Sequence, residues 1–193
     1  MNHPELSILI PAAGASGRLG QAKQLVNYRG KSLIQNAVDT AYSLAPHEII
    51  VVTGANAAEV KDAVQHPPVR WVHNQHWSTG MGGSIALGAA SVDPQSMGVM
   101  ILLCDQWRLQ AHDLKALAET WQSDTEHIVC AHADGVNMPP VIFPASCFNQ
   151  LMTLENDQGA RSLIAARAEL VKMVLVENAA FDLNTQAQLD GLE

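Results

Sequence analysis

Residues 11–24, "PAAGASGRLGQAKQ", combine three glycines with one arginine and one lysine, and they follow directly on the apolar run "LSILI". Glycines allow a backbone to approach a ligand closely, and the side chains of Arg18 and Lys23 supply positive charge that favours phosphate. The glycines recur every third residue, which fits neither the GxxxxGK[ST] loop nor the GxGxxG dinucleotide fingerprint. The segment therefore indicates a phosphate-binding loop of another type. A connection whose glycines only turn the chain accounts less well for the two cations.

Two later segments place side-chain oxygens directly after apolar runs. Asp105 ends "GVMILLCD" (98–105), and Asp182 and Asn184 follow "VKMVLV" (171–176). In an open α/β sheet, ligands bind beyond the carboxyl ends of the strands, so these oxygens would meet the glycine loop along one edge. Mg²⁺ prefers carboxylate, water and phosphate oxygens. The combination is the outline of a phosphoryl or nucleotidyl transfer site.

The segment "NQHWSTGMGGS" (74–84) is a further candidate. Gly80 lies just before a predicted helix, and the free N–H groups at a helix start suit a base edge or an acceptor phosphate. Asn74 and Ser84 would add polar side chains to such a pocket. The alternative is a tight turn in which Trp77 only fills the core.

Two other residues each admit two interpretations. Arg161, in "DQGARSL" at a predicted helix start, would hold an acceptor phosphate or pair with Asp157. Cys104 ends an apolar run, and without a paired histidine it is interpreted as a buried small hydrophobic residue rather than a nucleophile.

These residues must be positioned by short apolar runs that alternate with amphipathic stretches. Continuous apolar strands between helices indicate a parallel sheet covered on both faces, hence an α/β fold, expected as a single domain over 1–193. The rhythm breaks after residue 127, which predicts an antiparallel strand or small flap in the second half. Strands are predicted at 6–10, 48–54, 69–73, 98–105, 127–131, 140–143 and 171–176, and helices at 31–45, 56–64, 82–92, 111–121, 147–154, 159–170 and near the C-terminus.

Composition narrows the partners and the compartment. Of the 193 residues, 48% are hydrophobic, which is enough for a sizeable core, and the net charge of −8 argues against nucleic-acid or membrane-surface binding. The three cysteines form no CxxC pair and no basic secretory leader precedes the first strand, so free thiols and a cytoplasmic location are expected. A few local cations can still bind an anionic small molecule.

The motifs together resemble a known family over nearly the whole chain. "PAAGASGRLGQAKQLVNYRGKSLI" closely resembles the LAAGxSxRMGxxKxLLxxxGxxLI signature of the MobA-like nucleotidyltransferases, and in particular the molybdenum cofactor cytidylyltransferase branch. "VVTGANAAEV" resembles VVTGHxAxxV, and "VHNQHWSTGMGGSIALGAASV" resembles NPxWxxGMxxSLxxGxxAL. "PVIFPASCFNQLMTLENDQGARSLI" resembles PVLFxxxxFxxLLxLxGDxGARxLL. "ILLCDQ" and "FDLNTQAQL" take the places of LLGDMP and DIDTPEDL.

The resemblance implies a three-layer, Rossmann-like fold and a role for each loop residue. Backbone atoms of Ala12, Ala13 and Gly14 would line the base and ribose. Ala13 stands where guanylyl-transferring relatives have a second glycine, and its methyl group narrows the pocket in favour of a pyrimidine. Asn74, Gly80 and Ser84 would complete the nucleotide pocket.

For the phosphates, the resemblance implies that Ser16, Gly17 and Arg18 meet the β- and γ-phosphates, with Arg18 stabilising the leaving pyrophosphate. Lys23 would reach the α-phosphate and the incoming acceptor. Asp105 would ligate Mg²⁺.

The second metal ligand would be Asp182 or Asn184, although the family usually has acids at both positions. Two segments depart from the pattern: "CDQW" replaces GDMP, and Met138 and Pro139 stand where Gly and Asn or His are usual.

The function implied is Mg²⁺-dependent transfer of CMP from CTP to a molybdopterin-type acceptor with release of pyrophosphate, with a molybdoenzyme as a possible recipient of the product. One alternative keeps the fold but uses another phosphorylated acceptor, such as a sugar 1-phosphate or methylerythritol phosphate. The other is a non-catalytic relative that binds and delivers the cofactor, suggested by Asn184, Met138 and the "CDQW" segment.

Overall fold

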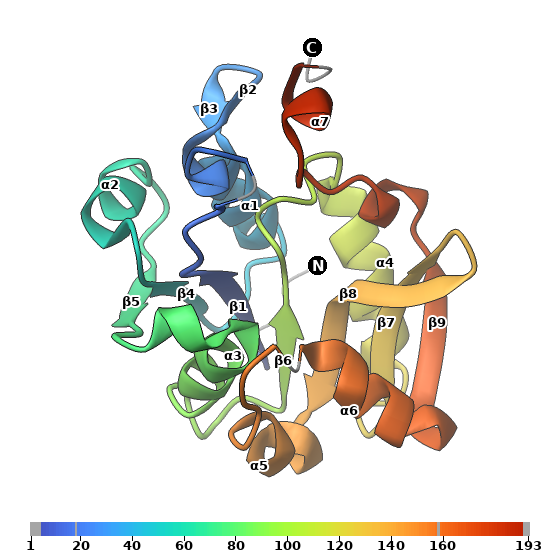
Figure 1. Cartoon of the computed structure of the whole chain (residues 1–193). Helices are drawn as coiled ribbons and strands as arrows, with labels where there is room; N and C mark the ends of the chain where they lie inside the picture. Colours follow the sequence, from blue (N-terminus) through green and yellow to red (C-terminus); the bar gives the residue numbers. More distant parts are fainter. Residues whose placement is uncertain (1–4, 18, 158, 191–193) are drawn as a thin grey trace.

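The computed structural model describes residues 5–17, 19–157 and 159–190. At its centre lies a seven-stranded sheet in the order β5-β4-β1-β6-β8-β7-β9 (Figure 1). The strands are β1 (Leu6–Ala12), β4 (Ile49–Thr53), β5 (Arg70–His73), β6 (Gly98–Ile101), β7 (Ile128–Ala133), β8 (Val136–Pro144) and β9 (Val171–Leu175).

The pairing is mostly parallel, as predicted. β1 pairs in parallel with β4 and with β6, β4 pairs in parallel with β5, and β7 with β9. Only β8 runs against its two neighbours, β6 and β7, which confirms the expected antiparallel strand in the second half.

One strand is shorter than the sequence suggests. The apolar run 98–105 was expected to remain in the sheet, but β6 ends at Ile101, whose partner in β8 is Val141. Beyond this pair, the Leu102 N–H still donates to the Leu9 carbonyl of β1 at 3.0 Å, but the pairing with β8 has ended. Asp105 therefore lies on a loop after the strand.

Helices cover both faces of the sheet, which confirms the three-layer architecture (Figure 1). Side chains of β1 alternate between the two cores: Ile8 and Ile10 belong to the one under α1 and α4, and Leu9 to the one under α3 and α6. One face carries α1 (Leu33–Tyr42) and α4 (Ala111–Gln122), and the other carries α3 (Met81–Ala89), α5 (Phe148–Leu151) and α6 (Ala160–Ala166).

The remaining helices are short. α2 (Ala57–Asp62) follows β4, and α7 (Gln186–Asp190) lies near the C-terminus. The helix predicted over 159–170 is interrupted at Arg167, where the backbone leaves helical geometry at φ −126° and ψ 36°. The helix predicted over 147–154 is reduced to α5 and a preceding 3₁₀ turn. Within the described ranges, no helix is both long and apolar enough to cross a membrane.

A small hairpin that the sequence analysis did not predict joins the glycine loop to α1. Strands β2 (Asn27–Tyr28) and β3 (Lys31–Ser32) pair around Arg29 and Gly30, both with positive φ. The hairpin leads into α1, where the hydroxyl of Ser32 accepts a hydrogen bond from the backbone N–H of Gln35.

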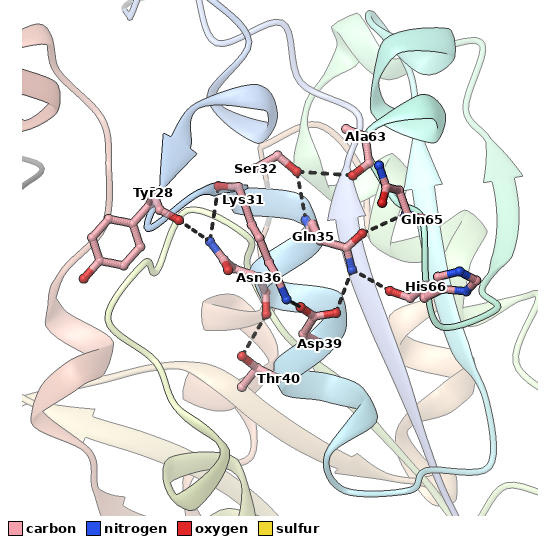
Figure 2. A network of polar contacts seen from close by, with 10 residues as sticks. All are labelled: Tyr28, Lys31, Ser32, Gln35, Asn36, Asp39, Thr40, Ala63, Gln65 and His66. Carbon is pink, nitrogen blue, oxygen red and sulfur yellow. Dashed lines mark hydrogen bonds and ion pairs between the residues drawn. The ribbon is translucent and has the colours of Figure 1, made fainter.

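Two side chains of α1 tie neighbouring segments to it (Figure 2). The buried Gln35 amide donates to the Asp39 carboxylate at 2.7 Å and to the His66 carbonyl, and its oxygen accepts from the Gln65 N–H at 2.7 Å. Asn36 donates to the Tyr28 carbonyl at 3.1 Å. The hairpin and the segment after α2 are therefore both held against α1.

Close packing explains one of the glycines in α3. A Cβ atom at Gly88 would lie 2.3 Å from Leu9 Cδ1 and 3.0 Å from Val52 Cγ2, both in fully buried side chains. At Gly83 the nearest atom would be Thr79 Oγ1, at an ordinary 3.7 Å. Gly88 thus allows α3 to approach β1 and β4, as the glycine content of this segment predicted, whereas Gly83 has room for a methyl group.

Substitution by alanine should therefore have opposite effects at the two positions. Gly88→Ala should lower the free energy of unfolding by about 1–3 kcal/mol, because Leu9 is enclosed in the core and must shift. Gly83→Ala should raise it by up to about 1 kcal/mol, since alanine is the better helix former. Urea denaturation of both variants measures the difference, and equal effects would contradict the packing described.

Candidate functional site

A cavity of about 290 Å³ opens at the carboxyl ends of β1 and β6. The chain leaves β1 toward β4 on one side, and β6 is added later on the other side, so this is the topological switch point where α/β sheets bind ligands. Residues that line the cavity come from the end of β1, the glycine loop, the start of α3 and the loop after β6; they include Ala13, Gly14, Ser16, Lys23, Gln24, Trp77, Gly80, Ser84, Asp105 and Asp157.

Glycines of the loop leave open space. Cβ atoms added at Gly14 and Gly17 would have no described heavy atom within 4 Å, and neither residue has a positive φ. Nothing in the described fold therefore requires glycine at these two positions. Backbone left open in this way gives a ligand room to approach closely.

Ser16 gives the loop its shape. Its φ is 55°, its carbonyl accepts from the Leu19 N–H at 2.9 Å, and its hydroxyl oxygen accepts from the Lys23 N–H at 3.1 Å. Since the oxygen is the acceptor in that bond, the hydroxyl proton remains available to a ligand.

Gln24 is a residue that the sequence analysis missed. Its side chain is 2% exposed, and its amide donates to the carbonyls of Ala12 at 3.1 Å and Gly14 at 2.8 Å. These two bonds hold the backbone of the loop in place, and Gln24 itself lines the cavity. The mixed polar and apolar sequence around Gln24, "GQAKQLVN", contains no local signal that distinguishes it from an exposed glutamine.

Lys23 and Asp105 form an ion pair across the cavity floor. Burial opposes the charge of Lys23, but the neighbouring Asp105 carboxylate outweighs it, so the pKa of Lys23 is raised above 10.5. Asp105 is 6% exposed. Burial also raises the pKa of the adjacent Cys104 thiol to about 12, which keeps it protonated and agrees with its interpretation as a small hydrophobic residue.

The segment 181–184 lies beside Asp105 without lining the cavity. The Leu183 N–H donates to the Asp105 carbonyl at 3.0 Å, and the amide of Asn184 donates to the Asp182 carboxylate. The Asp182 charge also contributes to the raised pKa of Lys23. The last strand region is thus brought to the loop after β6, as the strand-end argument predicted.

The donor set fits Mg²⁺ bound together with a nucleotide. Within the described residues no group of three or more His, Cys, Asp or Glu side chains could enclose a metal. Asp105 and Asp182 nevertheless supply two nearby carboxylates, and Mg²⁺ is commonly held by one or two carboxylates with the remaining positions taken by phosphates and water.

The start of α3 forms the opposite wall. Gly80 has a φ of 124°, and a Cβ there would lie 2.3 Å from the Asn156 backbone, so only glycine fits. The Gly82 N–H donates to the Asn156 carbonyl at 2.7 Å, which locks residues 156–157 to this wall and places Asp157 at the cavity. From the sequence alone, Asp157 is a candidate only as an ion-pair partner of Arg161.

Asn74 supports this wall from behind. Its amide donates to the Ser84 hydroxyl at 2.9 Å, and its oxygen accepts from the His76 N–H at 2.9 Å. Asn74 is 5% exposed and does not line the cavity, whereas Ser84 does. Trp77 both packs against the core and lines the cavity, so both interpretations of that residue apply.

The structure thus gathers seven of the predicted residues around one cavity: Ala13, Gly14, Ser16, Lys23, Gly80, Ser84 and Asp105. Ala12, Gly17, Asn74, Asp182 and Asn184 lie outside its lining. Arg18 lies outside the described residues. Arg161 is exposed and lines a separate cavity with Asn137, and no ion pair with Asp157 occurs among the described side chains.

Removal of the Asp105 charge should change the titration of Lys23. In Asp105→Asn the pKa of Lys23 should fall below its wild-type value, because burial then acts against a weaker attraction. In the wild type, the stability from the pair should persist below pH 10.5 and be lost as the pH rises through the raised pKa. NMR titration of ¹³C-labelled lysine side chains measures the shift. An unchanged Lys23 pKa in the variant would contradict the pairing.

Comparison with known proteins agrees with this geometry. Residues 8–171 match the model of the MobA-like NTP transferase domain. "Nicotine blue oxidoreductase" of Paenarthrobacter nicotinovorans is 29% identical over 96% of this chain and 95% of its own. "Purine catabolism protein PucB" of Bacillus subtilis (strain 168) is 30% identical over 85% of this chain and 82% of its own.

Solved structures show the same fold. Rv0371c from Mycobacterium tuberculosis H37Rv superposes with a TM-score of 0.87 at 23% identity, over 100% of this chain and 98% of that one. A complex of the same protein with manganese gives a TM-score of 0.82 at 21% identity, over 97% of both chains. With the switch-point cavity, the glycine loop and the family match over most of its length, the chain belongs to the MobA-like NTP transferases, a family of nucleotidyltransferases.

Proposed function

We propose that residues 1–193 act as one Mg²⁺-dependent cytidylyltransferase domain that transfers CMP from CTP to molybdopterin phosphate and releases pyrophosphate. The observation that carries this proposal is the position of Lys23 and Asp105, which form an ion pair in the lining of the switch-point cavity, beside the open glycine loop. A cation for phosphate and an acid for the metal are thereby held at one place.

The triphosphate would lie along residues 14–18. Gly14 and Gly17 leave space for it, Ser16 keeps a hydroxyl proton to donate, and Arg18 would stabilise the charge on the leaving pyrophosphate. Lys23 would exchange its partner, passing from Asp105 to the α-phosphate as the nucleotide enters. That exchange keeps the buried ammonium paired throughout.

Asp105 would hold Mg²⁺ together with Asp182 or Asn184. The metal, when bound, supplies neutralisation of phosphate charge and polarisation of the reacting phosphorus. The carboxylate of Asp105 becomes available for it when Lys23 turns to the phosphate, so metal and nucleotide are expected to bind together. The manganese complex of Rv0371c supports a divalent cation in this fold.

The preference for CTP rests on Ala13. This residue is 4% exposed and lines the cavity. Ala13 also belongs to the core on the α3 face of the sheet, which holds it in place. A methyl group at this position, where guanylyl-transferring relatives have glycine, would narrow the base region in favour of a pyrimidine.

The residues that depart from the family pattern near the acceptor side do not disrupt the fold around Asp105. Gln106 is 6% exposed, and its amide donates to the carbonyls of Pro139 at 2.7 Å and Ala179 at 2.8 Å. It thus ties the loop that carries Asp105 to β8 and to the segment before Asp182. This tie supports a retained catalytic site over a non-catalytic delivery role. In this proposal a molybdoenzyme receives the product.

Other acceptors and another chemistry are distinguished by assay. Purified protein with Mg²⁺ should release pyrophosphate with CTP and molybdopterin, and release none with sugar 1-phosphates or methylerythritol phosphate. Release with one of those acceptors instead would replace the acceptor assignment, and no release with any nucleotide would favour cofactor delivery. One relative is named an oxidoreductase, but oxidoreduction with a bound dinucleotide is not proposed for this chain because its glycine spacing differs from the GxGxxG fingerprint.

Loss of the metal ligand should abolish most of the activity. Asp105→Ala should lower kcat/KM by about 10²–10⁴-fold, because metal-ion stabilisation contributes several kcal/mol. Asp62→Ala, on the exposed face of α2 and away from the cavity, serves as the control and should leave the rate unchanged. Steady-state pyrophosphate release measures both, and an Asp105→Ala variant with wild-type activity would exclude a catalytic carboxylate.

Removal of the Ala13 methyl should relax the base selection. Ala13→Gly should raise the kcat/KM for GTP relative to CTP by about tenfold, within the range that one methyl group commands in a fitted pocket. Thermal stabilisation by CTP, GTP, ATP and UTP with Mg²⁺ provides a second readout, since a ligand at about 100 times its Kd adds about 2.7 kcal/mol. An unaltered ranking would show that Ala13 does not select the base.

A further inference from the structure

A second cavity, of about 350 Å³, lies on the other side of the loop that carries Asp105. It shares no lining residue with the switch-point cavity, and it is bounded by the β2–β3 hairpin, α1 and the start of α4. Its side chains are mostly polar or cationic, and they include Tyr28, Arg29, Asn36, Trp107, Arg108 and Asn178.

Two arginines in this cavity have their faces covered by aromatic rings. The guanidinium carbon of Arg108 lies 3.8 Å from the Phe181 ring centroid and 4.6 Å from that of Trp107. The guanidinium carbon of Arg29 lies 4.9 Å from the Tyr28 centroid. Stacking of this kind holds a guanidinium by its face and leaves its N–H edges free to donate.

Neither arginine is paired with an acid in the part of the chain that the structure describes. Among the described residues, neither Arg29 nor Arg108 has a carboxylate within 4 Å or a side-chain hydrogen bond, and no Asp or Glu lines the cavity. Asp113, which lies nearby, is already engaged by the Gln110 N–H at 2.9 Å and by the Asn178 amide at 3.0 Å. Two unpaired guanidiniums in one cavity are notable in a chain with 11 Lys and Arg residues and a net charge of −8.

We propose that this cavity is an anion site for the phosphate group of a small molecule, separate from the nucleotide cavity. Free guanidinium edges bind phosphate with paired hydrogen bonds. The volume is at the lower end of the range for small-molecule pockets. The rings are already in edge contact with each other, with Tyr28 to Trp107 centroids 5.0 Å apart and Trp107 to Phe181 centroids 6.2 Å apart. The aromatic faces thus serve the arginines, which favours a phosphate ligand over a stacked base.

Tryptophan signals allow the two cavities to be observed separately. Trp107 lines the proposed anion site, Trp77 lines the nucleotide cavity, and Trp121 is fully buried and lines neither. Indole N–H resonances of ¹⁵N-labelled protein can be followed during titration with inorganic phosphate, pyrophosphate and ribose 5-phosphate at constant ionic strength. At least one of these probes should shift the Trp107 resonance saturably, and the tightest one indicates whether free phosphate, pyrophosphate or a phosphate monoester is the ligand.

Variants test the assignment. The double variant Arg29→Gln/Arg108→Gln should raise the Kd reported by Trp107 at least about tenfold, because two charge-assisted donors are lost. Lys61→Gln is the matched control, since Lys61 also lies over a ring, that of Trp71 at 6.0 Å, but lines neither cavity. It should leave the Kd unchanged. If the double variant loses the wild-type Trp121 resonance, Arg108→Gln alone should raise the Kd about threefold or more.

The same titration in Lys23→Ala separates this proposal from the proposed function. Trp107 should respond as in the wild type, because Lys23 does not line this cavity. A Trp107 shift that is linear, that persists in the arginine variants, or that disappears in Lys23→Ala would overturn the proposal, whatever the outcome of the transferase assays.

Discussion

Parallel pairing of β1 with both β4 and β6 is the constraint on which the rest of the structure depends. Because the chain leaves β1 toward one neighbour and returns to the other side later, the carboxyl ends of β1 and β6 diverge and leave a crevice. The glycine loop enters that crevice from β1, and Asp105 enters it from the loop after β6. Gly88 permits α3 to pack closely on these strands, and the start of that helix closes the opposite wall.

Within the crevice, opposite charges hold the site in a resting arrangement. Lys23 is partly buried and Asp105 is largely buried. A buried charge without a partner is costly, and the ion pair gives each of these side chains a partner. The site thereby remains ordered in a protein that is acidic overall. Under the proposed function, a triphosphate would bring new negative charge for the lysine and a divalent cation would bring positive charge for the aspartate, so the exchange of partners would conserve local neutrality.

Around this centre, hydrogen bonds from amide side chains do much of the positioning. Gln24 fixes the glycine loop, Asn74 fixes Ser84, Gln106 ties the Asp105 loop to β8, and Gln35 ties α1 to its neighbours. Gln106 belongs to the segment that departs from the family pattern. Its buried bonds show how that departure is accommodated without displacing Asp105 from the cavity.

Local pattern sufficed for much of the fold and for part of the site. The apolar runs and their alternation with helices predicted the parallel sheet, its antiparallel strand and the three layers, since burial on both faces of a strand requires continuous apolar sequence. The loop spacing and the strand-end position of Asp105 predicted which residues meet, and the resemblance indicated the family that the comparisons confirmed.

Contacts between distant segments decided the remainder. The end of β6 at Ile101 is the end of its pairing with β8, a strand some forty residues later, which no local pattern records. Gln24 becomes part of the site because it donates to the carbonyls of Ala12 and Gly14. Asp157 does so because the neighbouring Asn156 backbone is bonded to the start of α3. Arg29 and Arg108 likewise line the same cavity only because the hairpin and the loop between β6 and α4 meet. Sequence periodicity reports burial along one element, whereas these positions are set by packing between elements.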